Sequence, residues 1–76
     1  MSVATEHFGR NVRAARRAKG WTQEDLAAET GLAVVQVSRI ERGVREVRLT
    51  TVLRLLSAFG VEAGELIDAD LIDAAR

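Results

Sequence analysis

Apolar residues recur along the chain at the spacing of α-helices, and single glycines separate the segments. Phe8, Val12 and Ala15 stand at i, i+4 and i+7, which predicts a first helix over about residues 4–18. The chain has no proline, and its turn signals are mostly single glycines, at positions 20, 31, 43, 60 and 64. This pattern predicts an all-α fold with short connections between the helices.

Capping signals and apolar spacing predict four further helices. Thr22 is a good N-cap for a second helix, which stops before Gly31 and turns Leu26 and Ala27 inward. The three others are predicted over about residues 33–42, 50–59 and 63–75. Because a chain of 76 residues buries only about 60% of its unfolded surface, it has too few apolar residues to form a second hydrophobic core. We therefore expect one compact five-helix domain over residues 1–76.

The predicted fourth helix has more apolar surface than a small domain needs. Its central stripe is expected to consist of Leu49, Val52, Leu56 and Phe59. Leu53 and Leu55 on the two flanks widen the apolar arc to about 160°, against about 100° for an ordinary surface helix. Leu53 or Leu55, together with Leu71 and Ile72 of the segment 63–75, are the candidates for a homodimer interface, unless the monomer core takes them up.

The two ends of the chain differ in charge although the formal net charge is zero. Residues 1–48 contain nine Arg or Lys and six Asp or Glu, whereas residues 49–76 contain two and five. A basic part beside an acidic part is typical of a protein in which one part meets nucleic acid. The alternative is an ordinary scatter of solvated charges.

The residue types that catalysis or metal binding requires are scarce. The chain has no cysteine, and we expect His7, its one histidine, to be an ordinary surface residue. Asp68, Asp70 and Asp73 have the spacing of a solvated helix face. We therefore expect no enzyme activity, no metal and no cofactor. No apolar run approaches the roughly 18 residues of a membrane span. The absence of cysteine suits a reducing compartment, so we expect a cytoplasmic protein.

The segment GWTQEDLAAETGLAVVQVSRIERG, residues 20–43, has the layout of two helices joined by a turn at Gly31. It resembles the phage-repressor (Cro-like, or XRE) family of helix-turn-helix proteins, and the likeness continues through LTTVLRLLSAFGVEAGEL, residues 49–66. Within that family, TQEDLA, SRIERG and Arg45 look most like the controller proteins of restriction-modification systems. The resemblance implies a lambda-repressor-like fold. It also implies a transcriptional regulator that binds double-stranded DNA at a pseudo-palindromic operator, as a homodimer, and controls its own promoter.

The predicted third helix has valines on both of its sides. With Val37 and Ile40 toward the core, a helical wheel turns Val35 and Arg39 outward. In a major groove, a valine can pack against a thymine methyl group, an arginine can donate two hydrogen bonds to guanine, and a glutamine can pair with adenine. The residues predicted for base readout are Val34, Val35, Gln36, Ser38 and Arg39. Partial core packing is the alternative for Val34, and a phosphate contact is the alternative for Arg39.

Four residues are predicted to bind the DNA backbone: Thr22, Gln23, Arg42 and Arg45, of which Arg45 is also a candidate for a base contact. The resemblance implies that Gln23, at the amino end of the second helix, anchors a phosphate, and free N–H groups there favour an anion. It also implies that Glu41, which faces inward, forms a structural ion pair with Arg16. Position 33, where relatives place a Ser or Thr cap, is Ala33, so that capping bond is missing.

A protein-interaction module is the alternative from a different class. In that case the domain is an antitoxin or a bridging factor, its partner is a toxin or RNA polymerase, and DNA binding is secondary. Val34 and Val35 would then form an exposed apolar anchor that the partner protein covers.

Overall fold

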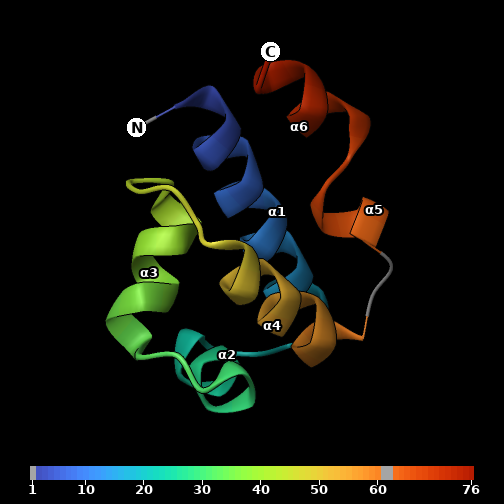
Figure 1. Cartoon of the computed structure of the whole chain (residues 1–76). Coiled ribbons are helices and arrows are strands. Elements are labelled where there is room, and N and C mark those ends of the chain that lie inside the picture. The colour runs from blue at the N-terminus through green and yellow to red at the C-terminus, as the bar shows by residue number, and fades with distance from the viewer. Residues whose placement is uncertain (1, 61–62) are drawn as a thin grey trace.

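Six α-helices pack together in the part of the chain that the computed structural model describes, residues 2–60 and 63–76. In chain order they are α1 (Val3–Ala18), α2 (Gln23–Thr30), α3 (Val34–Arg42), α4 (Leu49–Phe59), α5 (Ala63–Leu66) and α6 (Ala69–Ala74). In Figure 1, α3 lies on one side of α1, and α5 and α6 lie on the other. The described residues contain no strand, so the predicted all-α fold is confirmed. None of these helices is long and apolar enough to cross a membrane.

The first four helices begin and end close to the predicted positions because the local capping signals are strong. The Thr22 hydroxyl oxygen accepts a hydrogen bond from the Asp25 N–H at 3.1 Å, and the Asp25 carboxylate accepts one from the Thr22 N–H at 2.9 Å. This reciprocal pair satisfies two donors at the start of α2. At the other end, Gly31 has a φ of +75°, a left-handed conformation that glycine adopts without strain. Residues 31–33 therefore connect α2 to α3 in a tight turn.

The single helix predicted over residues 63–75 is wrong, because the structure divides this segment into α5 and α6. Asp68 has an extended backbone and caps α6, and its Oδ1 accepts the Leu71 N–H at 2.8 Å. This hydrogen bond holds the pKa of the Asp68 carboxyl below its ordinary value. An aspartate that starts a new helix interrupts an apolar pattern that by itself indicates one continuous helix.

Side chains of α1 hold the C-terminal segment in place. Asn11 donates hydrogen bonds to the Leu66 carbonyl oxygen at 2.8 Å and to Asp68 Oδ2 at 3.2 Å. The Nε2 atom of His7 lies 3.1 Å from Asp68 Oδ1. The predictions for His7 and Asp68 are therefore wrong. His7 is partly buried in a polar contact, and Asp68 does not belong to a purely solvated face.

The core brings together side chains from all the longer helices. The largest fully buried ones are those of Val12, Leu26, Val37, Leu55, Phe59 and Leu66. Trp21, which lies just before α2, stacks on Phe59 of α4 with the ring centroids 5.9 Å apart. This aromatic pair joins the start of α2 to the end of α4.

The buried face of α4 is rotated relative to the predicted one. Leu55 is fully buried, whereas Leu49 is 72% exposed, because the helix packs against α2 and α1 on the side of Leu55. Leu71 of α6 is also buried. Leu55 and Leu71 are therefore core residues, which corrects their prediction as interface candidates, while Leu53 and Ile72 remain exposed. A wide apolar arc does not by itself determine which part of it faces the core.

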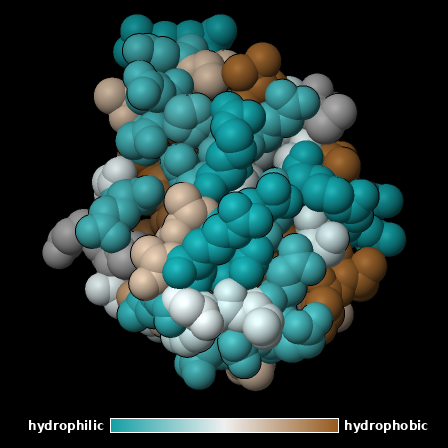
Figure 2. Space-filling view, turned by 180° about the vertical axis from the view of Figure 1, so that it is seen from behind, coloured by the Kyte–Doolittle hydropathy of each residue, from teal (hydrophilic) through white to brown (hydrophobic). Residues whose placement is uncertain are grey.

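Several large hydrophobic side chains stay exposed outside the core. They are Val3, Val34, Val35, Val44, Leu49, Leu53, Ile67 and Ile72. On the face seen in Figure 2, polar and charged side chains form a broad band across the middle of the surface, and the hydrophobic patches are small and lie mostly near its edges. The exposed hydrophobic side chains of this face thus do not form one continuous patch.

Two glycines allow α1 and α3 to approach each other closely. Gly9 lies against the end of α3, where a Cβ atom at position 9 would collide with the carbonyl oxygens of Ile40 and Glu41. Gly43, with a φ of +67°, lies against the backbone of Thr5, and the Thr5 hydroxyl donates to the Gly43 carbonyl oxygen at 3.1 Å. The backbones of the two helices are therefore in direct contact along this line.

We predict that Gly9→Ala lowers the free energy of unfolding by about 1–3 kcal/mol, because the added methyl group forces α1 and α3 apart. Urea titration followed by circular dichroism measures the change. Gly64→Ala is the matched control, since a Cβ atom there meets nothing within 4 Å, and it should leave stability unchanged or raise it slightly. If Gly9→Ala is as stable as the unchanged protein, the two helices are not in the close contact described above.

Candidate nucleic-acid interface

One face of α3 is turned to solvent. The predicted readout residues lie on this face, with Val34, Val35, Gln36 and Arg39 exposed and Ser38 at its edge. Val35 is 53% exposed, whereas Val37 on the opposite side lies in the core. Arg42 is exposed at the last position of the helix. The structure thus exposes the predicted readout residues on one helix, over a wide arc with Val35 and Arg39 near its centre.

The amino end of α3 is capped by a readout candidate. Ala33 has no side chain that can accept a hydrogen bond, and Gln36 supplies the other half of the usual arrangement: its Oε1 accepts the Ala33 N–H at 2.9 Å. The NH2 group of Gln36 is left for another partner. Pairing with adenine through both amide atoms would require Oε1 to leave the Ala33 N–H.

A basic hollow of about 480 Å³ lies on one side of α3, between this helix, the loop that follows it and the first half of α4. Its arginines are Arg39, Arg45, Arg48 and Arg54. Glu46 is the one acidic residue among those that line it, so the hollow has a clear excess of positive charge. Arg48 and Arg54 are not among the residues predicted from the sequence to bind DNA. A usable signal was present, because Arg54 is the one charged residue in the apolar segment 49–59.

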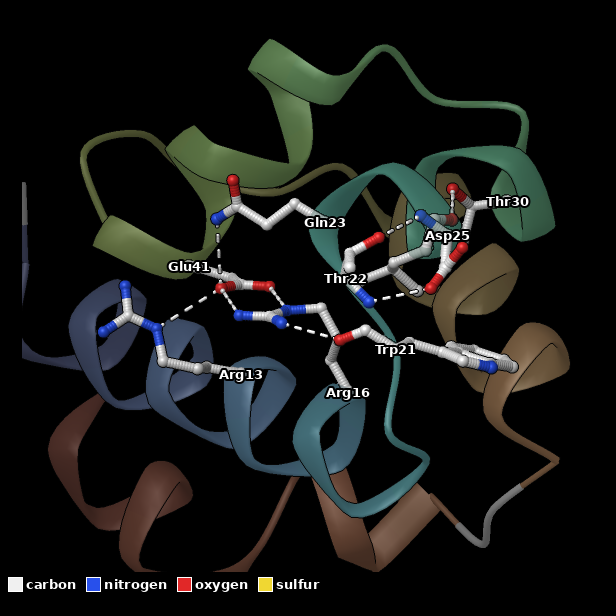
Figure 3. A network of polar contacts seen from close by, with 9 residues as sticks. Arg13, Arg16, Trp21, Thr22, Gln23, Asp25, Thr30 and Glu41 are labelled. Atoms are coloured by element: carbon white, nitrogen blue, oxygen red, sulfur yellow. Dashed lines mark hydrogen bonds and ion pairs between the residues drawn. The ribbon is translucent and has the colours of Figure 1, made fainter.

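On the other side of α3, the buried carboxylate of Glu41 joins three helices (Figure 3). Arg16 of α1 donates to both of its oxygens, from Nε to Oε2 at 2.6 Å and from Nη2 to Oε1 at 3.0 Å. Gln23 of α2 donates from Nε2 to Oε1 at 3.3 Å, and Arg13 of α1 donates from Nε to the same atom at 3.3 Å. The structure therefore contains the ion pair expected from the sequence and adds Arg13 and Gln23 to it. We call these four residues the Glu41 cluster.

Hydrogen bonds keep the Glu41 carboxyl ionised although its side chain is fully buried. Burial alone raises the pKa of Glu41, but the hydrogen bonds from Arg16 and Gln23 and the charge of Arg16 outweigh burial and hold this pKa below its ordinary value. The hydrogen bond to Glu41 also raises the pKa of Arg16. Arg16 donates in addition from Nη1 to the Trp21 carbonyl oxygen at 2.8 Å, so it fixes the segment that leads into α2.

The residues predicted to bind the DNA backbone lie on both sides of α3. Thr22 caps α2 and Gln23 is its first residue, and the Gln23 amide contacts Glu41. Thr22 and Gln23 are therefore on the side of the Glu41 cluster, whereas Arg42 is exposed at the end of α3, about 100° around the helix from Glu41. Arg45 lines the basic hollow on the opposite side. Arg13 is not among the residues predicted from the sequence, although its spacing of three residues from Arg16 places both on one side of α1.

We predict that Glu41→Gln lowers the free energy of unfolding at pH 7 by about 2 kcal/mol, because the hydrogen bonds from the arginines lose their charged acceptor. The folded-state pKa of Glu41 is lowered, so its charge stabilises the fold fully above the unfolded-state pKa of about 4.3. This stabilisation is lost as the pH falls through the folded-state pKa. The difference between the two proteins should therefore be constant near neutral pH and shrink in acid, as urea titrations at a series of pH values would measure.

Glu46→Gln is the control for the loss of one carboxylate, since Glu46 is exposed in the loop after α3. This variant should match the unchanged protein at neutral pH. A stability difference for Glu41→Gln that grows as the pH falls below about 4 would contradict the role given to the Glu41 charge.

Comparison with known proteins relates these features to a family. A family model described as helix-turn-helix matches residues 12–66 of the chain. The control protein C.BamHI of Bacillus amyloliquefaciens is 40% identical over 62 residues, which cover 80% of this chain and 76% of that protein. The solved structure of the restriction-modification controller protein C.AhdI from Aeromonas hydrophila has a TM-score of 0.78 and 42% identity, and the match covers 82% of this chain and 94% of that one.

Longer regulators contain a similar segment. The HTH-type transcriptional regulator y4dL of Sinorhizobium fredii is 37% identical over 62 residues, or 82% of this chain. The chain spans 32% of the length of y4dL, and 24% of the length of three HTH-type regulators from Mycobacterium. The matched residues 12–66 include α2, the turn and the whole of α3. The chain therefore belongs to the helix-turn-helix family, among its XRE-like DNA-binding transcriptional regulators, and not to a family of enzymes.

Proposed function

We propose that the chain binds a specific DNA operator as a homodimer and regulates transcription from its own promoter, as the controller of a restriction-modification operon. The observation that carries this proposal is the exposed face of α3, which has basic side chains on both of its sides. A major groove admits one α-helix, and the phosphates of the two strands form its walls. A helix that displays base-reading groups between two basic flanks matches this shape.

The proposed base contacts use the exposed face of α3. Arg39 is proposed to donate two hydrogen bonds to O6 and N7 of a guanine. Val35 is exposed in the first turn of the helix and is proposed to pack against a thymine methyl group, with Val34 and Ser38 at the edge of the contact. Gln36 is proposed to donate from its free NH2 group. Arg39 also lines the basic hollow, so a phosphate contact is the alternative for this residue.

The two flanks of α3 are proposed to bind phosphates of opposite strands. On one flank, Thr22 and Gln23 start α2, where free N–H groups and the helix dipole favour an anion, and Arg42 adds a positive charge. On the other flank, the basic hollow supplies Arg45, Arg48 and Arg54. Phosphate contacts on both flanks would fix the orientation of α3 in the groove, and base contacts would then give the sequence preference.

The dimer is proposed to form through the apolar surface that α4 and α6 leave exposed. Leu53 is 53% exposed and Ile72 is 50% exposed, and Leu49 lies one turn before Leu53 on α4. A hollow of about 190 Å³ lies between α1, α4 and the C-terminal segment and is lined in part by Val52 and Ile67. A second copy of the chain would remove this apolar surface from water. Two copies of α3 would then meet half-sites about 34 Å apart.

The similarity to C.BamHI and C.AhdI supports the proposed role as a controller, since these relatives are described as control and restriction-modification controller proteins. The second candidate is an antitoxin or another protein-interaction module whose partner is a toxin or RNA polymerase. The observation that favours it is the exposure of two adjacent valines, Val34 and Val35, because a partner protein can cover them.

The test is binding of the purified protein to the duplex directly upstream of its own gene and to a shuffled duplex, across a series of salt concentrations. Tight binding that prefers the upstream sequence supports the regulator. Weak and equal binding that salt abolishes would reject sequence-specific regulation and favour the protein-interaction module.

We predict that Arg39→Ala weakens binding to the upstream duplex by about 1–3 kcal/mol and changes binding to the shuffled duplex much less. Arg42→Ala is the comparison variant. It should weaken binding to both duplexes alike and reduce the dependence of binding on salt, because it removes a phosphate contact. Fluorescence anisotropy titrations measure both effects. Equal losses on the two duplexes for Arg39→Ala would remove its role in base readout.

We predict that Leu53→Asp and Ile72→Asp each raise the dimer dissociation constant at least about 10-fold, because an aspartate in an apolar interface stays desolvated and unpaired. Sedimentation equilibrium measures the constant, and circular dichroism checks that each variant folds. Ala28→Asp, an equivalent change on the exposed side of α2, should leave the dimer intact. Unchanged dimers in both test variants would place the subunit interface elsewhere.

A further inference from the structure

Arg13 adds a second positive charge to the Glu41 cluster, although the charge of Arg16 alone neutralises Glu41. Arg16 donates to both oxygens of the Glu41 carboxylate, at 2.6 and 3.0 Å, so one guanidinium group already balances the carboxylate. Arg13 reaches the carboxylate through Nε alone, at the longer distance of 3.3 Å. Two guanidinium groups around one carboxylate leave an excess of one positive charge.

The free end of Arg13 is available to a ligand. The Arg13 side chain is 41% exposed, compared with 11% for Arg16. Figure 3 shows the two terminal nitrogens of Arg13 pointing away from the Glu41 carboxylate. Within the described part of the chain, these nitrogens donate no hydrogen bond to another residue. Four N–H donors are therefore left for a group outside the protein.

Arg13 lies next to a residue already assigned to a phosphate. Both Arg13 and Gln23 donate to Oε1 of Glu41 at 3.3 Å, so the guanidinium of α1 and the amide of α2 are neighbours. Gln23 is the first residue of α2, and Arg42 is exposed at the nearby end of α3. The surplus charge of the Glu41 cluster thus lies on the flank of α3 that is proposed to face one DNA strand.

We infer that Arg13 is a further contact to the DNA backbone and that Glu41 positions it together with Gln23. The hydrogen bond from Nε to Glu41 fixes the plane of the guanidinium group and leaves Nη1 and Nη2 to donate to phosphate oxygens. One buried carboxylate therefore sets side chains from α1 and α2 against the same strand. The inference rests on the proposed DNA binding by α3, and it extends the contact surface to α1, outside the helix-turn-helix.

The experiment compares Arg13→Gln with the unchanged protein on the upstream and shuffled duplexes across a salt series. Each phosphate contact contributes about 0.9 to the slope of log K against log salt. Loss of one contact should therefore reduce that slope by about 0.9 and weaken binding roughly five-fold at about 0.15 M salt, equally on both duplexes. Arg76→Gln is the control for charge. Arg76 follows α6 and pairs with Asp73 of that helix, and α6 lies on the other side of α1 from α3. This control should keep the slope of the unchanged protein.

Thermal unfolding of the same proteins separates binding from folding. A structural role alone releases no counterions, so an unchanged slope for Arg13→Gln overturns the inference whatever the stability of the variant. Arg13→Lys keeps the charge and should keep the slope, but it should bind less tightly, because an ammonium group cannot hold the fixed fork that Glu41 orients. If the unchanged protein shows no preference for the upstream duplex, the proposed function fails instead, and the slopes on shuffled DNA still decide the role of Arg13.

Discussion

The ion pair between Arg16 and the buried Glu41 carboxylate is the interaction on which the presentation of α3 depends. An ionised carboxylate without partners in a protein interior costs on the order of several kcal/mol, so the end of α3 is stable in this place only when Arg16 reaches it. The same guanidinium holds the Trp21 carbonyl oxygen, and Gln23 completes the contact from α2. The relative placement of the two helices of the motif is thus set by one charged group as well as by apolar packing.

Close backbone contact makes this ion pair geometrically possible. Gly9 and Gly43 let α1 lie directly against the end of α3, which brings the carboxylate within reach of the guanidinium. The apolar core holds the rest of the molecule together, with Trp21 stacked on Phe59. Hydrogen bonds from Asn11 hold the C-terminal segment against the side of α1 that faces away from α3. α1 is therefore the element that connects the part of the fold that presents α3 to the C-terminal segment.

Local signals explain why the first four helices were predictable from the sequence. Thr22 and Gly31 act on their own neighbours, so their effect can be read from a few adjacent residues. The break at Asp68 could not be predicted, because apolar spacing continues through it and does not distinguish a capping aspartate from a solvated one. The rotation of α4 could not be predicted either, since its apolar arc offers more than one inward face. The Arg16–Glu41 pair came from the family resemblance. Arg13 and Arg54 each had a local signal in the sequence, but their positions beside α3, like that of Arg48, become visible only when separate helices are brought together.

The cap on α3 bears on the DNA sequences that the proposed regulator would select. The carbonyl oxygen of Gln36 is already engaged by the Ala33 N–H, so an adenine that uses both amide atoms must displace an existing bond of nearly equal strength. The gain in binding free energy from adenine at that position would therefore be small, and so would the loss from another base. If α3 reads bases as proposed, operators would tolerate changes at the base pair that faces Gln36, while the pair that faces Arg39 would stay fixed. Promoters that differ at that one position would then share a single regulator.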